Sequence, residues 1–174
     1  IFHSHFFGSE KENRAIINIG GISNISILKI NGDYSGYDIG PGNILLDSWF
    51  QKYNKGAYDP KGSWGKQGSV NDALLKNLKQ DNYFKKSYPK STGTDYFNYQ
   101  WINNNLKKTN VLIKPIDVQA TLVELSALII TEAIRKHQGI KAVAICGGGV
   151  ENDFLISRIR TKYAGPVFSS AKWG

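Results

Sequence analysis

Residues 14–43 contain three short strand-like runs separated by glycine-bearing bends, and this pattern leaves few folds open. The runs cover 15–19, 23–30 and 34–39, and the first two are rich in isoleucine, which packs well in strands. A glycine pair forms the first bend, and Asn31-Gly32 supplies the positive φ angles of a tight hairpin turn in the second. We therefore predict a β-meander of three consecutive strands.

Helical periodicity begins after this meander. Residues 54–68 carry four glycines without a clear period and predict a long loop, which in compact domains is often functional. A helix, a buried strand, a glycine bend and a second helix follow, which together form an α/β unit. Helices are expected from residue 44 onward and over 71–78, 96–106, 117–137 and 151–163, with Thr94 or Asp95 as the N-cap of the third and strands over 141–146 and 167–168.

The composition describes an ordinary soluble globular domain. Of 174 residues, 41% are hydrophobic and 21% are charged. No apolar run approaches the roughly 18 residues that a membrane span needs. Cys146 is the single cysteine, which excludes an internal disulfide and a cysteine-cluster metal site and fits a reducing compartment. We expect a cytoplasmic protein that binds no membrane.

The net charge of +8 raises the question of a nucleic-acid partner. The lysines are scattered, however, with only Lys85-Lys86 and Lys107-Lys108 adjacent, and no basic stripe alternates with aromatic residues. A solvated, lysine-rich surface is the simpler interpretation, so no nucleic-acid partner is expected. Small polyanions such as nucleotides remain compatible with this charge.

Two of the glycine bends suit an anionic or flat ligand. Gly147-Gly148-Gly149 follows a buried strand and opens a helix, and three glycines let a ligand approach the backbone closely. Gly20-Gly21 predicts either a simple hairpin turn or a phosphate loop. Neither bend has the spacing of a P-loop or of a dinucleotide-binding Rossmann motif.

The third bend follows Asp38, which ends an otherwise apolar strand. A strand end holds a carboxylate in a fixed place, and the glycines after it leave room for a substrate, so Asp38 is a candidate general base. The alternative is that its carboxylate caps the following helix or accepts hydrogen bonds from loop amides. Residue types alone leave both interpretations open.

Other polar residues are weaker candidates. His3 and His5 lie close together but have no third ligand nearby, so no metal site is expected. His137, near a helix C-terminus, is expected to interact with the helix dipole. Glu124 is expected at the surface rather than in a catalytic site.

Five motifs together resemble one family. RAIINIGGISNISIL, GYDIGPGN, YPKSTGTDYFN, DVQATLVELSA and AICGGGVEN occur in the order and spacing of anhydro-N-acetylmuramic acid kinases, over almost the whole chain. That family belongs to the sugar kinase, actin and Hsp70 superfamily, whose ribonuclease H-like domains face each other across a cleft. The resemblance implies ATP-dependent phosphorylation of 1,6-anhydro-N-acetylmuramic acid with hydrolytic opening of the anhydro ring. N-acetylmuramic acid 6-phosphate would be the product, formed during cytoplasmic recycling of peptidoglycan.

The resemblance assigns roles only to residues that match the motifs. Asp38 matches the family's catalytic base, which would activate water to attack the anomeric carbon while the freed O6 takes the γ-phosphoryl group. ATP and Mg²⁺ would be the cofactors, and no residue is assigned as a metal ligand. The second phosphate loop would comprise Asn18, Gly20, Gly21, Ser23 and Asn24, the adenosine motif Gly147, Gly148 and Gly149, and the substrate contacts Gly40, Gly42 and Asn43.

The sequence also departs from the family pattern. A first phosphate loop, rich in glycine and Ser/Thr, has no counterpart here, nor has the family's C-terminal helix with its acidic residue. Thr94-Asp95 stand where the family has Arg-Glu, so no contact of that arginine is carried over. Ser91 and Thr92, just before them, suit either a phosphate contact or a cap for the next helix.

Residues 1–174 are therefore interpreted as a single ribonuclease H-like α/β domain, the second half of a two-domain kinase without its N-terminal domain and extreme C-terminus. Such a half is expected to be inactive alone. Its partners would be the anhydro amino sugar and ATP, and a homodimer is left open. Two alternatives are a non-catalytic domain of the same fold that binds nucleotide or a partner, and a kinase of the same superfamily for another sugar.

Overall fold

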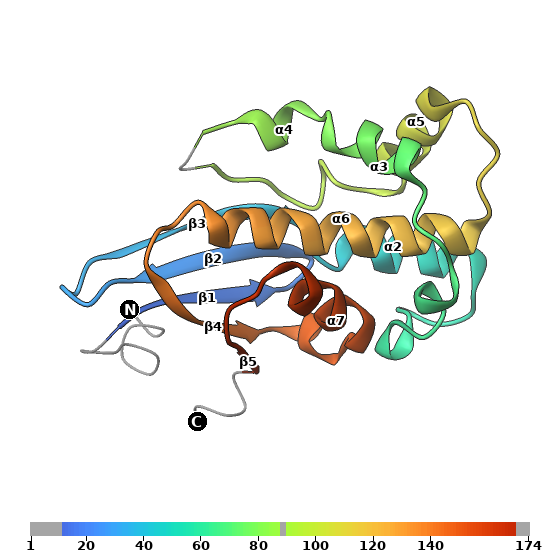
Figure 1. The fold of residues 1–174 in the computed structure, drawn as a ribbon. Helices are drawn as coiled ribbons and strands as arrows, with labels where there is room; N and C mark the ends of the chain where they lie inside the picture. The colour runs from blue at the N-terminus through green and yellow to red at the C-terminus, as the bar shows by residue number, and fades with distance from the viewer. Residues whose placement is uncertain (1–11, 88–89, 170–174) are drawn as a thin grey trace.

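The computed structural model describes residues 12–87 and 90–169 and contains one five-stranded mixed sheet in the order β3-β2-β1-β4-β5 (Figure 1). Antiparallel pairing joins β1 to β2 and β2 to β3, whereas β1 with β4 and β4 with β5 are parallel. The predicted meander and the α/β class are confirmed. The strands are β1 (Asn13–Ile19), β2 (Ile22–Leu28), β3 (Tyr34–Pro41), β4 (Ile140–Cys146) and β5 (Val167–Ser169).

One long helix, α6 (Pro115–Arg135), runs along a face of the sheet (Figure 1). It packs against α7 on one side and α3 on the other, and it also contacts α2 and β3. None of the described helices is long and apolar enough to cross a membrane. The other helices are α2 (Ile44–Tyr53), α3 (Asp72–Lys79), α4 (Asn82–Lys85), α5 (Tyr99–Thr109) and α7 (Asp153–Lys162), with short 3₁₀ turns η1 (Pro60–Gly62), η2 (Gly65–Gln67) and η3 (Gly148–Glu151).

The core lies between α6 and the sheet. Because α6 is covered by the sheet and by other helices, it is apolar around most of its circumference rather than along one stripe. Pro115 stands at its first position, where a backbone N–H would have no partner within the helix and the missing donor of proline costs little. Fully buried partners include Leu122 and Ile130 on α6 and Ile17, Ile19 and Ile25 on β1 and β2.

Helix α5 starts later than predicted. Asn98, not Thr94 or Asp95, is its N-cap, and the Asn98 Oδ1 accepts from the Trp101 amide at 2.9 Å. The reason is tertiary: Phe97 is fully buried and packs against Tyr83, Phe84 and Trp101, which holds the chain before Asn98 in an irregular conformation. The short helix α4, which carries Tyr83 and Phe84 into this cluster, was not predicted.

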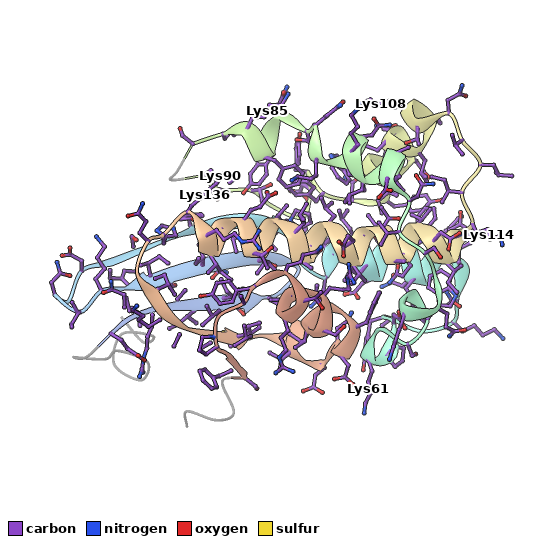
Figure 2. All side chains as sticks on the ribbon, in the orientation of Figure 1. Lys61, Lys85, Lys90, Lys108, Lys114 and Lys136 are labelled. Atoms are coloured by element: carbon purple, nitrogen blue, oxygen red, sulfur yellow. The ribbon has the colours of Figure 1, made fainter. Side chains whose placement is uncertain are left out.

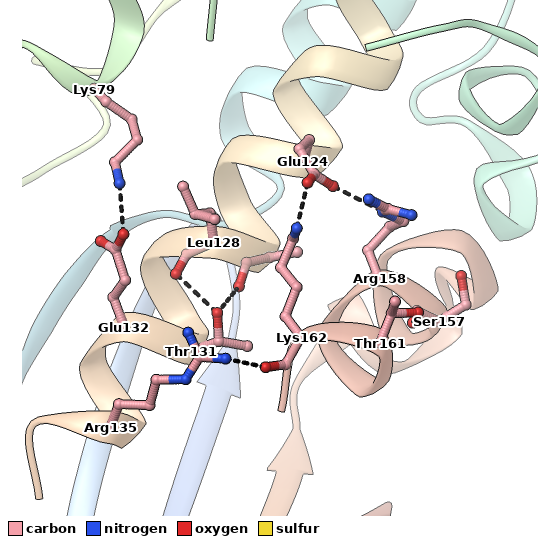
Figure 3. A network of polar contacts seen from close by, with 11 residues as sticks. Lys79, Glu124, Leu128, Thr131, Glu132, Arg135, Ser157, Arg158, Thr161 and Lys162 are labelled. Atoms are coloured by element: carbon pink, nitrogen blue, oxygen red, sulfur yellow. Dashed lines mark hydrogen bonds and ion pairs between the residues drawn. The ribbon is translucent and has the colours of Figure 1, made fainter. Parts of the chain in front are cut away.

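Glu124 is not a surface residue, so that expectation is wrong. It is 6% exposed between α6 and α7, where it accepts from Arg158 Nε at 2.7 Å and pairs with Lys162 (Figure 3). Burial opposes ionisation, but the hydrogen bonds from these two cations outweigh it and lower the pKa of Glu124. The helical pattern alone does not reveal that α7 supplies two cations to this position.

The labelled lysines are spread across the molecule, with Lys114 and Lys136 at opposite ends of α6, and Lys90 lies close enough to Lys136 for the two charges to interact (Figure 2). Next to Lys136, the His137 Nε2 and the Tyr37 hydroxyl lie 2.9 Å apart. Burial, Lys29 and Lys136 lower the pKa of His137, which disfavours the charged ring that an interaction with the helix dipole requires. His3 and His5 lie outside the described residues.

Candidate active site

The three glycine bends meet at one edge of the sheet. Strands β1, β3 and β4 point the same way, so the bends that follow them gather where these strands end. The Gly42 amide donates to the Gly21 carbonyl at 2.8 Å, and the Asn43 amide donates to the Gly20 carbonyl at 2.9 Å. The bend at Gly147–Gly149, more than a hundred residues further along the chain, packs against the end of β1, so all three bends lie in the place where α/β sheets commonly bind ligands.

A row of polar residues crosses the meander just before these bends. In the strand register, Asn18 of β1 stands opposite Asn24 of β2, which in turn stands opposite Asp38 of β3. Residues that stand directly opposite one another share a face of the sheet. A bulge follows at once, because Ser23 pairs with Gly40 and leaves Ile39 as the extra residue. Three of the predicted site residues therefore lie side by side.

The carboxylate of Asp38 is held by residues 90–92. Its Oδ2 accepts from the Ser91 hydroxyl and from the Thr92 amide, each at 3.1 Å. Accepting from a loop amide is one of the alternatives weighed for Asp38, whereas the capping alternative fails because Asn43 is the N-cap position of α2. Ser91 and Thr92 do not cap the next helix, whose N-cap is Asn98; they bind Asp38. Within the described residues, Oδ1 has no hydrogen bond.

The three glycines of the bend after β4, which was predicted to be the adenosine motif, are not equivalent. Gly147 has φ +83°, and a Cβ there would overlap the Asn18 side chain, while a Cβ on Gly149 would overlap Ile19. Close packing against the end of β1 therefore requires both glycines. Gly148 differs, since the nearest atom to its added Cβ is the Asn43 Nδ2 at 3.9 Å. Only Gly148 leaves open space on the side where a ligand could approach.

The glycines after Asp38 also serve packing. Gly40 has φ +152°, and a Cβ there would stand 3.0 Å from Ile129 and 3.1 Å from Phe84, so this position faces the core. A Cβ on Gly42 would lie 2.6 Å from the Ser23 Oγ and would overlap the Gly20 carbonyl. Ser23 is fully buried, and its hydroxyl has no partner in the described part of the chain. Because this hydroxyl has almost no exposed surface, a ligand cannot reach it in this conformation.

A cavity of about 320 Å³ opens beside Gly148, within the size range of small-ligand pockets. The predicted long loop 54–68, of a kind that is often functional in compact domains, supplies Tyr58, Asp59 and Lys61 to its lining. Burial raises the pKa of Asp47 in the cavity wall to about 6. The lining residues come from α2, the long loop and η3: Asn43, Leu46, Asp47, Tyr58, Asp59, Lys61, Gly148, Glu151 and Asn152.

Asp59 shapes this cavity rather than reacting in it. It is 5% exposed, and its two oxygens accept from the Trp64 amide at 2.9 Å and the Gly65 amide at 2.8 Å. These bonds fix the loop that forms one wall. Lys61, in the same loop, has φ 57°, an uncommon value for a residue with a side chain. The wall is therefore preformed by local hydrogen bonds.

Comparison with known protein families gives one match over almost the whole chain. The sequence model of the family described as anhydro-N-acetylmuramic acid kinase matches residues 1–172. A kinase of that name from Pseudomonas savastanoi pv. phaseolicola is 44% identical over 159 residues, covering 91% of this chain and 43% of the relative. The Vibrio cholerae kinase is 46% identical over 161 residues, with the same coverage of 91% and 43%. The chain thus spans less than half the length of these curated relatives.

Solved structures with low sequence identity share the fold. The activator of 2-hydroxyisocaproyl-CoA dehydratase from Clostridium difficile, determined with bound ADPNP, superimposes with a TM-score of 0.57 at 15% identity, covering 91% of this chain and 54% of that one. Gluconate kinase from Lactobacillus acidophilus gives a TM-score of 0.53 at 10% identity, covering 95% and 36%. The expected actin-like, ribonuclease H-like fold is confirmed.

Proposed function

Because this chain belongs to the anhydro-N-acetylmuramic acid kinase family, we propose that it forms one half of an enzyme that phosphorylates 1,6-anhydro-N-acetylmuramic acid with ATP and opens the anhydro ring with water. The observation that carries the proposal is the row Asn18–Asn24–Asp38 beside the glycine hairpin. A domain that only binds nucleotide has no need of a carboxylate at this place.

In this reaction Asp38 is the general base. It takes a proton from water as the water oxygen bonds to the anomeric carbon, and the bond from that carbon to O6 breaks. The freed O6 then bonds to the γ-phosphorus of ATP, and ADP leaves. The Asp38 Oδ1, which has no hydrogen bond to a described residue, is the oxygen that would accept the proton.

The site has features that fit ATP. The backbone of the glycine hairpin would contact the phosphates, and the cavity beside Gly148 would hold the nucleoside. Mg²⁺ would neutralise phosphate charge when bound. No group of three His, Cys, Asp or Glu side chains suited to a metal lies among residues 12–87 and 90–169, so phosphate oxygens and water would supply most of its ligands.

The remaining contacts would come from the part of the relatives' length that this chain does not span. We also propose a cytoplasmic location, because the family resemblance implies a part in the cytoplasmic recycling of peptidoglycan. Gly40 faces the core, so its contribution to substrate binding would be through the backbone, while Asn43 at the cavity wall would contact ligand with its side chain.

The test is Asp38→Asn in a protein expressed at the full length of the relatives, assayed with ATP and the anhydro sugar. Turnover should fall by about 10³-fold or more, because the amide cannot accept the proton, while the Kd for ATP stays within about twofold. Asp33→Asn, in the exposed turn between β2 and β3, is the matched control and should keep full activity. Turnover that survives in Asp38→Asn would refute the assignment of the base, and a panel of other sugars would identify a different substrate.

A further inference from the structure

Residues 90–94 lie against both the proposed base, Asp38, and the glycine hairpin at Gly20-Gly21. The Asp38 amide donates to the Lys90 carbonyl at 3.2 Å, and the Asp38 Oδ2 accepts from Ser91 and Thr92. At the other end of the segment, the Thr94 methyl lies 3.7 Å from where a Cβ on Gly21 would stand. This segment belongs to the KSTGTD motif, in which Ser91 and Thr92 were predicted either to contact a phosphate or to cap the next helix.

The hydrogen bonds around Asp38 fix its backbone and one of its carboxylate oxygens. The Tyr83 hydroxyl donates to the Asp38 carbonyl at 3.1 Å, so the residue is held from the α4 side as well. Both side-chain bonds go to Oδ2, and neither goes to Oδ1. A carboxylate that accepts hydrogen bonds at one oxygen cannot rotate freely about χ2. Without such bonds, this torsion of aspartate has a broad, roughly two-fold distribution.

We propose that Ser91 is a positioning residue for the proposed kinase reaction: its hydroxyl, with the Thr92 amide, holds the Asp38 carboxylate so that Oδ1 is presented to the attacking water. The inference rests on the proposed function of Asp38. The Ser91 side chain is exposed, so we expect that it can be changed without disturbing the fold. The Thr92 bond uses a backbone amide and survives any substitution of that side chain.

The test compares Ser91→Ala, Ser91→Thr and Ser87→Ala in the protein at the full length of its relatives. Ser91→Ala removes one of the two bonds and should lower kcat by about 10-fold, with KM for the sugar changed by less than about twofold, because a misplaced base affects the transition state and not ground-state binding. Ser91→Thr retains a γ-hydroxyl and should restore most of the lost kcat. Ser87→Ala makes the same change at an exposed position of the same loop and should match the wild type.

The outcomes separate this inference from the proposal on which it rests. If Ser91→Ala keeps kcat within about twofold of the wild type while Asp38→Asn is inactive, Ser91 does not position the base and the inference is wrong. The inference is also wrong if Ser91→Thr is as slow as Ser91→Ala, or if KM rises and kcat does not fall. If Asp38→Asn is itself active, the proposed role of Asp38 fails first. Equal melting temperatures for the variants would exclude a general loss of structure.

Discussion

At the scale of single residues, glycine occupies the three positions of the bend after β4 for two different physical reasons. Gly147 and Gly149 are required because their backbones press against Asn18 and Ile19 of β1, whereas Gly148 borders the cavity. Three consecutive glycines therefore combine a packing requirement with space for a ligand. The sequence pattern alone attributed all three to the ligand.

This difference predicts opposite results for two adjacent substitutions. Gly147→Ala should lower the free energy of unfolding by about 2–4 kcal/mol, because alanine is strained at φ +83° and its methyl would overlap the Asn18 side chain. Gly148→Ala, with no atom nearer than 3.9 Å, should change stability by less than about 1 kcal/mol. Urea denaturation of the two variants measures both values. Equal losses would contradict the packing assigned to Gly147.

Gly148→Ala should still weaken nucleotide binding if the cavity holds the nucleoside.

Asp47, in the wall of the same cavity, was not predicted as a site residue, since an acidic residue in the first turn of a helix is ordinary. Its raised pKa, about 6, arises from its burial, and it lies in the wall of a cavity that residues of the long loop and η3 also line.

At the scale of elements, the contact between α6 and α7 depends on a buried carboxylate. Glu124 of α6 meets Arg158 and Lys162, which stand four residues apart on α7 and so lie on one face of that helix (Figure 3). Arg135 of α6 also donates to the Lys162 carbonyl. The two helices are therefore tied at several points in addition to their apolar contacts.

Glu124→Gln should cost about 1–3 kcal/mol of unfolding free energy at pH 7, because it removes the charge that two cations face. The folded-state pKa of Glu124 is lowered, so its contribution is present above the unfolded pKa and disappears as the pH falls through the folded value. The gap between wild type and variant should therefore close in acid. Denaturation curves from pH 7 to pH 3 measure this gap.

Glu132→Gln is the matched control on the same helix. Glu132 pairs with Lys79, but its side chain is 42% exposed, so the loss should stay below about 1 kcal/mol. If Glu132→Gln lowered the free energy of unfolding as much as Glu124→Gln, burial would not explain the contribution of the Glu124 ion pairs to stability.

Most elements were predictable from local pattern, and the exceptions have a shared cause. The meander, α6 and the strand β4 follow from apolar periodicity and turn residues. The start of α5 and the short helix α4 do not, because both are positioned by aromatic packing around Phe97. Such aromatic contacts join residues that are separated in the sequence, so the local sequence around each residue does not predict them.

At the scale of the whole molecule, we propose that this chain supplies one wall of the site. The glycine hairpin, Asp38 and the cavity are all at one edge of the sheet, and the chain spans about 43% of the length of its curated relatives. The family resemblance implies a site between two domains, so we propose that the second wall comes from the rest of that length.

The purified 174-residue chain should therefore bind ATP weakly and show no measurable turnover of the anhydro sugar. Titration calorimetry and a coupled ADP assay measure the two quantities, and the protein at the full length of its relatives provides the positive control. Turnover by the short chain comparable to that control would mean that the site is complete without a second wall.

The sequence by itself determined the α/β class, the meander, the family resemblance and the candidate residues, because these depend on local periodicity, on turn chemistry and on short motifs. Tertiary structure alone decided which residues meet. It aligned Asn18, Asn24 and Asp38 through strand register, brought Ser91 to the Asp38 carboxylate, and buried Glu124 against α7. The physical reason is that register and helix packing optimise contacts across the whole core, and no local segment contains that information.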